Sequence, residues 1–218
     1  MTDGQMGQHL SHIPQQVGKL AALLNRLVHF TASHWLLIVN AVMAVQATLP
    51  ALPPVLMLAG WHSAARFMYS LFQPLCHQLP ERSFFLFGPQ LTYQFEELQS
   101  LVGPNVPLRF IGSPTTGYKL AVCQRDLATY ASILVAGLAF TLLRQRLKPL
   151  SLKAFGLLCM PMAIDGFGQL FGMWESTWWS RVLSGGLFGI ACVWLAYPYV
   201  ESGMKDVLKV TAPTEPEP

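Results

Sequence analysis

Long apolar segments constrain the fold of this chain more than any other feature. Three of them are almost free of charge and long enough to cross about 30 Å of hydrocarbon as helices: residues 120–143, 150–173 and 178–200. A fourth lies at 35–59, where Pro50, Pro53 and Pro54 should kink or stop the helix near its far end. We therefore predict an all-α fold, a polytopic membrane helical bundle of about four transmembrane helices.

The composition agrees with a bilayer environment. Hydrophobic residues make up 52% and charged residues 11% of the 218 positions, whereas a soluble domain carries about 25% charged residues. The lipid bilayer is therefore the first expected partner. The net charge is only +3, and the basic residues lie beside apolar segments rather than in one patch, so we expect no nucleic-acid binding. A membrane-protein partner and a homo-oligomer both stay open.

Residues 60–75 have the pattern of an interfacial helix. Apolar residues recur there at helical spacing: Ala64, Phe67, Met68, Leu71 and Leu75. His62, Arg66 and Gln73 occupy the opposite face. This arrangement favours an amphipathic helix on the membrane surface over a further span.

Lysine and arginine set the expected topology, since they accumulate in cytoplasmic flanks. They lie before the first span, between the second and third, and after the fourth: Lys19, Arg26, Arg144, Arg146, Lys148, Lys153, Lys205 and Lys209. We expect a cell-membrane protein with both termini cytoplasmic. The predicted parts are a cytoplasmic amphipathic segment at 1–34, a membrane helical domain at 35–200 with an extracytoplasmic loop at 76–119, and a disordered cytoplasmic tail at 201–218.

A candidate metal site lies at the expected outer face. Cys76 is followed by His77, and Cys123 precedes Asp126 by one helical turn. Thiolate with imidazole suits zinc, copper or iron, and a carboxylate can also ligate zinc. A disulfide between Cys76 and Cys123 is equally compatible with an oxidising compartment, and unpaired thiols are a third alternative. The sequence does not fix which cofactor, if any, is bound.

A second polar group is expected in the outer half of the helices. Helical rise places Asp165, Gln169 and Arg181 at neighbouring depths, and the short loop before the last span adds Glu175. An ionised group in the bilayer needs a partner, and Arg181 is the predicted partner of Asp165. These residues are candidate catalytic groups, with Asp165 or Glu175 handling protons and Arg181 binding an anion. The alternative is a buried polar network that fixes helix packing.

Four short blocks carry a family resemblance: Cys-His-Gln-x-Pro-x-Arg-Ser at 76–83, Val-Cys-x-Arg at 122–125, Pro-Met-Ala-Ile-Asp-Gly-x-x-Gln at 161–169 and Glu-Ser-x-x-x-Arg at 175–181. Together they resemble a family of bacterial and archaeal multi-pass membrane proteins catalogued as a domain of unknown function (DUF2085). The resemblance implies a membrane fold but no activity. This chain departs from it in two ways, since Asp126 replaces a second cysteine and residues 89–119 extend the outer loop. A solvated insertion is the simpler interpretation of that extension, and a partner-binding segment or a cap over the site are the alternatives.

Three function classes follow from these patterns. The first is an enzymatic or metal-binding site at the outer membrane surface. The second is a non-catalytic membrane subunit or assembly factor with a structural Cys76–Cys123 disulfide. The third is a small-solute or ion transporter, for which four spans without an internal repeat would require an oligomer.

Overall fold

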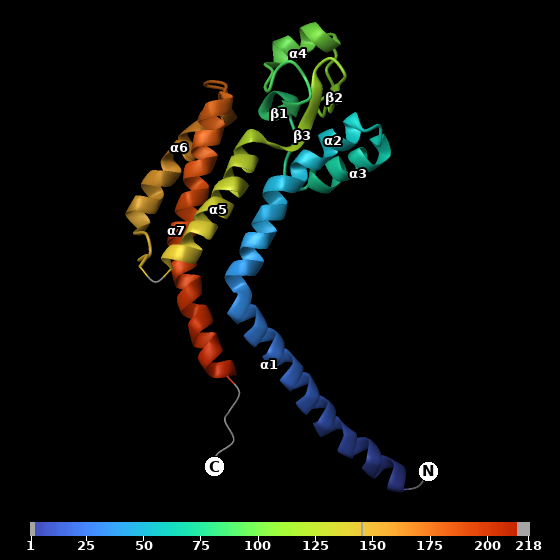
Figure 1. The fold of residues 1–218 in the computed structure, drawn as a ribbon, viewed down its shortest axis with the longest axis vertical. Helices are drawn as coiled ribbons and strands as arrows, with labels where there is room; N and C mark the ends of the chain where they lie inside the picture. Colours follow the sequence, from blue (N-terminus) through green and yellow to red (C-terminus); the bar gives the residue numbers. More distant parts are fainter. Residues whose placement is uncertain (1–2, 145, 213–218) are drawn as a thin grey trace.

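Four long helices form the body of the molecule, with a small cap at one end (Figure 1). The computed structural model describes residues 3–144 and 146–212, and their side chains from residue 18 onward. The long helices are α1 (Asp3–Thr48), α5 (Gln124–Leu143), α6 (Leu152–Leu170) and α7 (Trp178–Thr211). Helix α1 begins and α7 ends at the end opposite the cap, and the α5–α6 connection lies on that side too.

Prolines end the first helix where the sequence predicts. After Thr48 the chain tightens into the 3-10 turn η1 (Leu49–Ala51), and then continues as α2 (Leu52–Leu58). Pro50, which lacks a backbone donor, is buried in this turn. The predicted kink or stop is confirmed. The next helix, α3 (His62–Phe72), has 11 residues and is too short to cross a bilayer.

An aromatic cluster holds α1, α5 and α7 together. The Trp35 ring packs edge-on against Tyr197 at 5.4 Å between centroids, and Phe140 meets Tyr197 at 5.6 Å. Trp35 Nε1 of α1 donates to Glu201 Oε2 of α7 at 3.1 Å, so the buried Glu201 carboxylate has a hydrogen-bond partner. Edge-on packing adds about 1 kcal/mol per pair beyond the area buried.

Two glycines let α5 and α7 approach closely. A Cβ at Gly185 would lie 2.5 Å from the Arg125 carbonyl oxygen, and one at Gly189 would lie 2.7 Å from that of Thr129. Neither position has room for a larger residue without moving a backbone. Small residues typically permit this kind of close approach between membrane helices.

The cap contains a β-sheet, which corrects the all-α prediction. Strands β1 (Ser83–Leu86), β2 (Gly112–Ser113) and β3 (Gly117–Cys123) form an antiparallel sheet in the order β1-β3-β2. Residues 120–123, predicted as the start of a membrane helix, belong to β3. Their apolar side chains Leu120, Ala121 and Val122 are buried within the cap. The high hydropathy of this segment therefore reflects burial against other protein residues and not contact with lipid.

The loop extension at 89–119 is folded rather than a simple solvated insertion. Its helix α4 (Phe95–Val102) begins with a capping box in which the Gln94 backbone N–H donates to Glu97 Oε2 at 2.8 Å. Leu98 is fully buried against Phe85 and Tyr93. The extension therefore has its own small core.

Three helical segments are long and apolar enough to cross a membrane: Gly18–Leu58, Gln124–Leu143 and Trp178–Thr211. The predicted count of four is not confirmed. Helix α6 lies beside α7 (Figure 1) but carries Lys153, Asp165 and Gln169 within 19 residues, which lowers its apolar character. Leu157, Ile164 and Phe167 on the same helix are exposed, so one of its faces is still apolar.

The two terminal segments of the chain, which were expected on the cytoplasmic side, differ in structure from the prediction. Residues 201–211, placed in a disordered tail, continue α7 to Thr211. There the Thr211 hydroxyl lies 3.0 Å from His29 Nδ1 of α1, a contact that ties the two helices together. The rest of that tail lies largely outside the described residues. At the other end, α1 runs without a break through residue 34.

Candidate metal centre and adjoining cavities

Three of the four predicted metal ligands meet at the junction between cap and bundle. Cys76 follows α3, Cys123 ends β3 and caps the N-terminus of α5, and Asp126 lies in the first turn of α5. The two Sγ atoms and a carboxylate oxygen of Asp126 all lie within 4.8 Å of one another. The strand-to-helix junction at Cys123 therefore creates the cluster, because it places a thiol and a carboxylate one turn apart.

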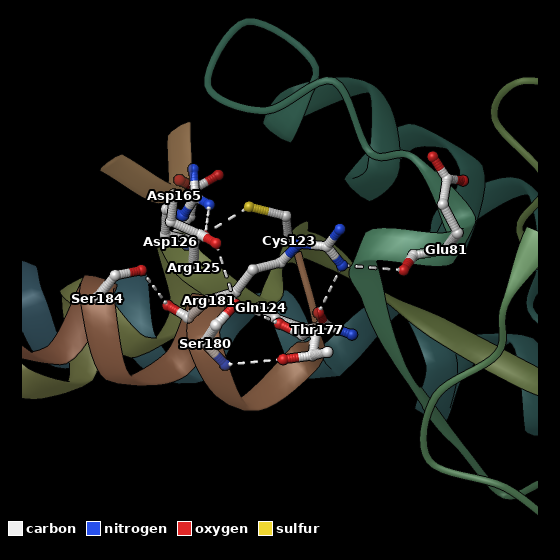
Figure 2. Close-up of polar contacts among 10 residues, drawn as sticks. All are labelled: Glu81, Cys123, Gln124, Arg125, Asp126, Asp165, Thr177, Ser180, Arg181 and Ser184. Carbon is white, nitrogen blue, oxygen red and sulfur yellow. Dashed lines mark hydrogen bonds and ion pairs between the residues drawn. The ribbon is translucent and has the colours of Figure 1, made fainter. Parts of the chain in front are cut away.

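Each of the two sulfur atoms accepts a hydrogen bond from a backbone N–H. The Cys123 N–H donates to Cys76 Sγ at 3.2 Å. The Asp126 N–H donates to Cys123 Sγ at 3.4 Å, a contact drawn in Figure 2. A hydrogen bond from the Cys123 thiol lowers the pKa of Cys76 although burial opposes it. The same bond, together with burial, raises the pKa of Cys123. Cys76 is thus the more acidic thiol of the pair.

His77 does not join this cluster. Its side chain is exposed, and the group of convergent ligands contains only Cys76, Cys123 and Asp126. The residue lines a cavity of about 260 Å³ beside them. Cys76 is buried whereas the adjacent His77 is exposed, so the two side chains have different surroundings.

Asp165 pairs with Arg125 instead of the predicted Arg181. The carboxylate of Asp165 accepts from Arg125 Nη2 of α5, and Ser180 Oγ donates to its other oxygen at 3.2 Å (Figure 2). The side chains of Arg125 and Asp165 are only 17% and 12% exposed. Sequence reasoning missed Arg125, although it lies in the first turn of α5 at the same end of the bundle as Asp165.

Arg181 faces the cap. Its Nη1 donates to the Gln124 side-chain oxygen and to the Glu81 carbonyl oxygen, each at 3.2 Å. Arg181 is 5% exposed and Gln124 1% exposed. This guanidinium therefore ties α7 to both α5 and the cap, and no carboxylate of the described residues lies within 4.0 Å of it.

Gln169 and Glu175 line a second, larger cavity of about 390 Å³. Gln169 and Arg181 border both cavities, so the two spaces adjoin. The folded extension contributes Thr92, Tyr93 and Glu97 to the larger one. The alternative interpretation of residues 89–119 as a cap over the site thus agrees with the structure.

Lys119 is a buried charge that sequence reasoning also missed. Its side chain is fully buried, and Nζ donates to the Gln78 carbonyl oxygen, while the Tyr69 hydroxyl donates to the Lys119 carbonyl oxygen. Burial lowers the pKa of Lys119 to about 8. The residue holds the segment after Cys76 against β3.

Comparisons with known proteins agree on a membrane family. The sequence model of a family described as "Predicted membrane protein (DUF2085)" matches residues 114–195. The chain is 26% identical over 141 residues to "Uncharacterized protein MJ1492" of Methanocaldococcus jannaschii, covering 63% of this chain and 71% of the relative. No solved structure matches the chain. The predicted resemblance is thereby confirmed over residues 114–195, which are similar to this family of predicted membrane proteins.

Proposed function

We propose that this membrane protein binds a transition-metal ion through Cys76, Cys123 and Asp126, and that the ion supports metal-assisted chemistry at the extracytoplasmic face. The observation that carries the proposal is the convergence of three ligand atoms within 4.8 Å of one another. Two thiolates and a carboxylate from three separate sequence positions suit zinc best.

The surroundings of the cluster favour a reactive metal site over a closed structural one. Structural zinc sites use four protein ligands, whereas catalytic sites use three and keep an open position. Here three ligands border the cavity of about 260 Å³, which gives a substrate or water access to the fourth position. The backbone N–H groups at both sulfur atoms would stabilise the thiolates that a metal requires.

The proposed orientation places the cap outside the cell. The α5–α6 connection lies at the end of α5 that is remote from the cap, on the side toward which α1 begins and α7 ends (Figure 1), and that connection contains Arg144 and Lys148. Positive residues favour the cytoplasmic side, so the cap and its cluster would face outward.

Cobalt titration of reduced, detergent-purified protein tests the metal site, because thiolate ligation of Co²⁺ gives a strong near-ultraviolet absorption. We expect this band in the wild type, its loss in Cys76→Ser and Cys123→Ser, and weaker binding in Asp126→Asn. The matched control is Cys192→Ser, which removes a free thiol elsewhere and should leave the band unchanged. A wild type without the band, or a band that survives Cys123→Ser, contradicts the proposal.

A structural disulfide is the second candidate, because the same proximity of the two sulfur atoms favours it in an oxidising compartment. A thiol count on unreduced protein distinguishes the two. If two thiols appear only after reduction, and Cys123→Ser abolishes that difference, the cysteines are bonded. The protein would then fit the class of non-catalytic membrane subunits.

A further inference from the structure

Three arginines from different parts of the fold border the cavity beside the metal cluster. Arg82 comes from the 3-10 turn η2 (Pro80–Arg82), Arg125 from α5 and Arg181 from α7. Asp126 is the one carboxylate among the described residues that line this cavity. The N-terminus of α5 also borders it, and that end of a helix carries partial positive charge. Arg82 lies 3.8 Å from a Glu81 carboxylate oxygen and Arg125 pairs with Asp165, whereas Arg181 has no carboxylate within 4.0 Å among the described residues. The cavity therefore borders one buried cation without a counter-ion.

Each of these arginines keeps a buried donor without an acceptor. The Nε atoms of Arg82, Arg125 and Arg181 are buried and have no hydrogen-bond partner among the described residues. Arg125 Nη2 is engaged by Asp165, and Arg181 Nη1 is engaged by Gln124 and the Glu81 carbonyl, so both guanidinium planes are fixed and each keeps a second Nη group. Because the Nε atoms are buried, a ligand in the cavity would meet these remaining Nη groups. A buried guanidinium without a counter-ion, as at Arg181, favours a ligand that supplies anionic oxygens.

The arrangement of the arginines favours a tetrahedral oxyanion. Donors that approach from three separate elements match a group with oxygens in several directions, and arginine is the residue best suited to bind phosphate. A planar carboxylate offers only two oxygens. The lining of the cavity also includes the apolar residues Leu75, Leu79 and Met162, which could contact the substituent of a phosphate ester.

We infer that this cavity binds a phosphate group, either as free phosphate or as the phosphoester headgroup of a lipid, through Arg82, Arg125 and Arg181. The inference deepens the proposed function, since the same cavity would place the phosphate beside the metal. It names the class of ligand on which the metal would act.

Phosphate titration by calorimetry tests this binding in reduced, detergent-purified protein that has been stripped of metal by chelator and then freed of the chelator. Saturable binding is expected, with at least a tenfold loss of affinity in Arg181→Met, as for a lost charge-assisted hydrogen bond. Arg109→Met is the matched control, because Arg109 is exposed and lines neither cavity. Since no metal is present, failure of the metal proposal leaves this result unaffected.

A second probe distinguishes a lipid headgroup from free phosphate as the ligand. Dihexanoyl phosphatidic acid that binds at least tenfold more tightly than inorganic phosphate identifies a lipid headgroup, and equal or weaker binding identifies free phosphate. Should Arg181→Met lower the melting temperature, Arg82→Met replaces it, because the Arg82 side chain is 38% exposed and less important for packing. No binding of either probe, affinity unchanged in both arginine variants, or equal binding of acetate would overturn the inference.

Discussion

Replacement of Asp165 by asparagine tests whether its ion pair with Arg125 holds together the half of the bundle nearer the cap. The substitution preserves the shape of the side chain but removes its charge. Arg125 is then left with a guanidinium that is only 17% exposed and no carboxylate within reach. Ser180 retains an oxygen to which its hydroxyl can donate, so the expected loss comes from the unpaired charge.

The magnitude follows from the burial of the pair. Removal of one partner from a buried ion pair costs about 3–5 kcal/mol, and the partial exposure of these side chains (17% and 12%) favours the lower limit. For a chain of this size about 3 kcal/mol corresponds to a fall of roughly 10 °C in melting temperature. In a double-mutant cycle, Arg125→Gln should recover about 2 kcal/mol of that loss, because neither charge then remains unpaired.

Thermal unfolding in detergent, followed by intrinsic tryptophan fluorescence, measures these shifts. The control is Asp206→Asn, since Asp206 pairs with Lys209 at 2.8 Å while its side chain is 69% exposed. An exposed pair contributes about 0–1 kcal/mol, so the control should melt within about 2 °C of the wild type. If Asp165→Asn melts as high as the control, or if the two single effects simply add, the pair does not stabilise the bundle.

Three further predictions concern other parts of the structure. Burial lowers the pKa of Lys119 to about 8 in the folded protein, so between pH 8 and about 10 the unfolded chain binds more protons than the folded chain. The free energy of unfolding should therefore rise with pH over this range, and Lys119→Met should flatten the rise in melting curves. Gly189→Val should disrupt α5–α7 packing and cost about 3 kcal/mol, measured in the same melt, whereas no loss would refute the close approach. Leu98→Ala, at a fully buried position, should cost about 2–5 kcal/mol of cap stability, seen as faster hydrogen exchange in residues 83–123 with α5 protected.

The sequence predicted the features that depend on local chemistry. Prolines after Thr48 end α1, because the missing donors act on the residues beside them. The i, i+3 relation of Cys123 and Asp126 predicted that both groups lie one turn apart, and the structure brings the predicted ligand Cys76 beside them.

Features that depend on tertiary contacts escaped the prediction. The apolar run that begins at Leu120 was interpreted as helix, although Leu120, Ala121 and Val122 are buried in β3, and hydropathy does not separate a buried strand from a membrane segment. The partner of Asp165 depended on how α5 and α7 are rotated, which spacing within one helix cannot give. Lys119 lies between two predicted elements, so no periodicity indicated its burial.

Metal content measured by elemental mass spectrometry tests the central claim most directly. Protein purified without chelator and reconstituted with zinc should retain close to one ion per chain after gel filtration, and Cys123→Ser should lose it while Cys192→Ser retains it. Absence of zinc from the reconstituted wild type, or an equal zinc content in Cys123→Ser, would contradict a metal site at Cys76, Cys123 and Asp126.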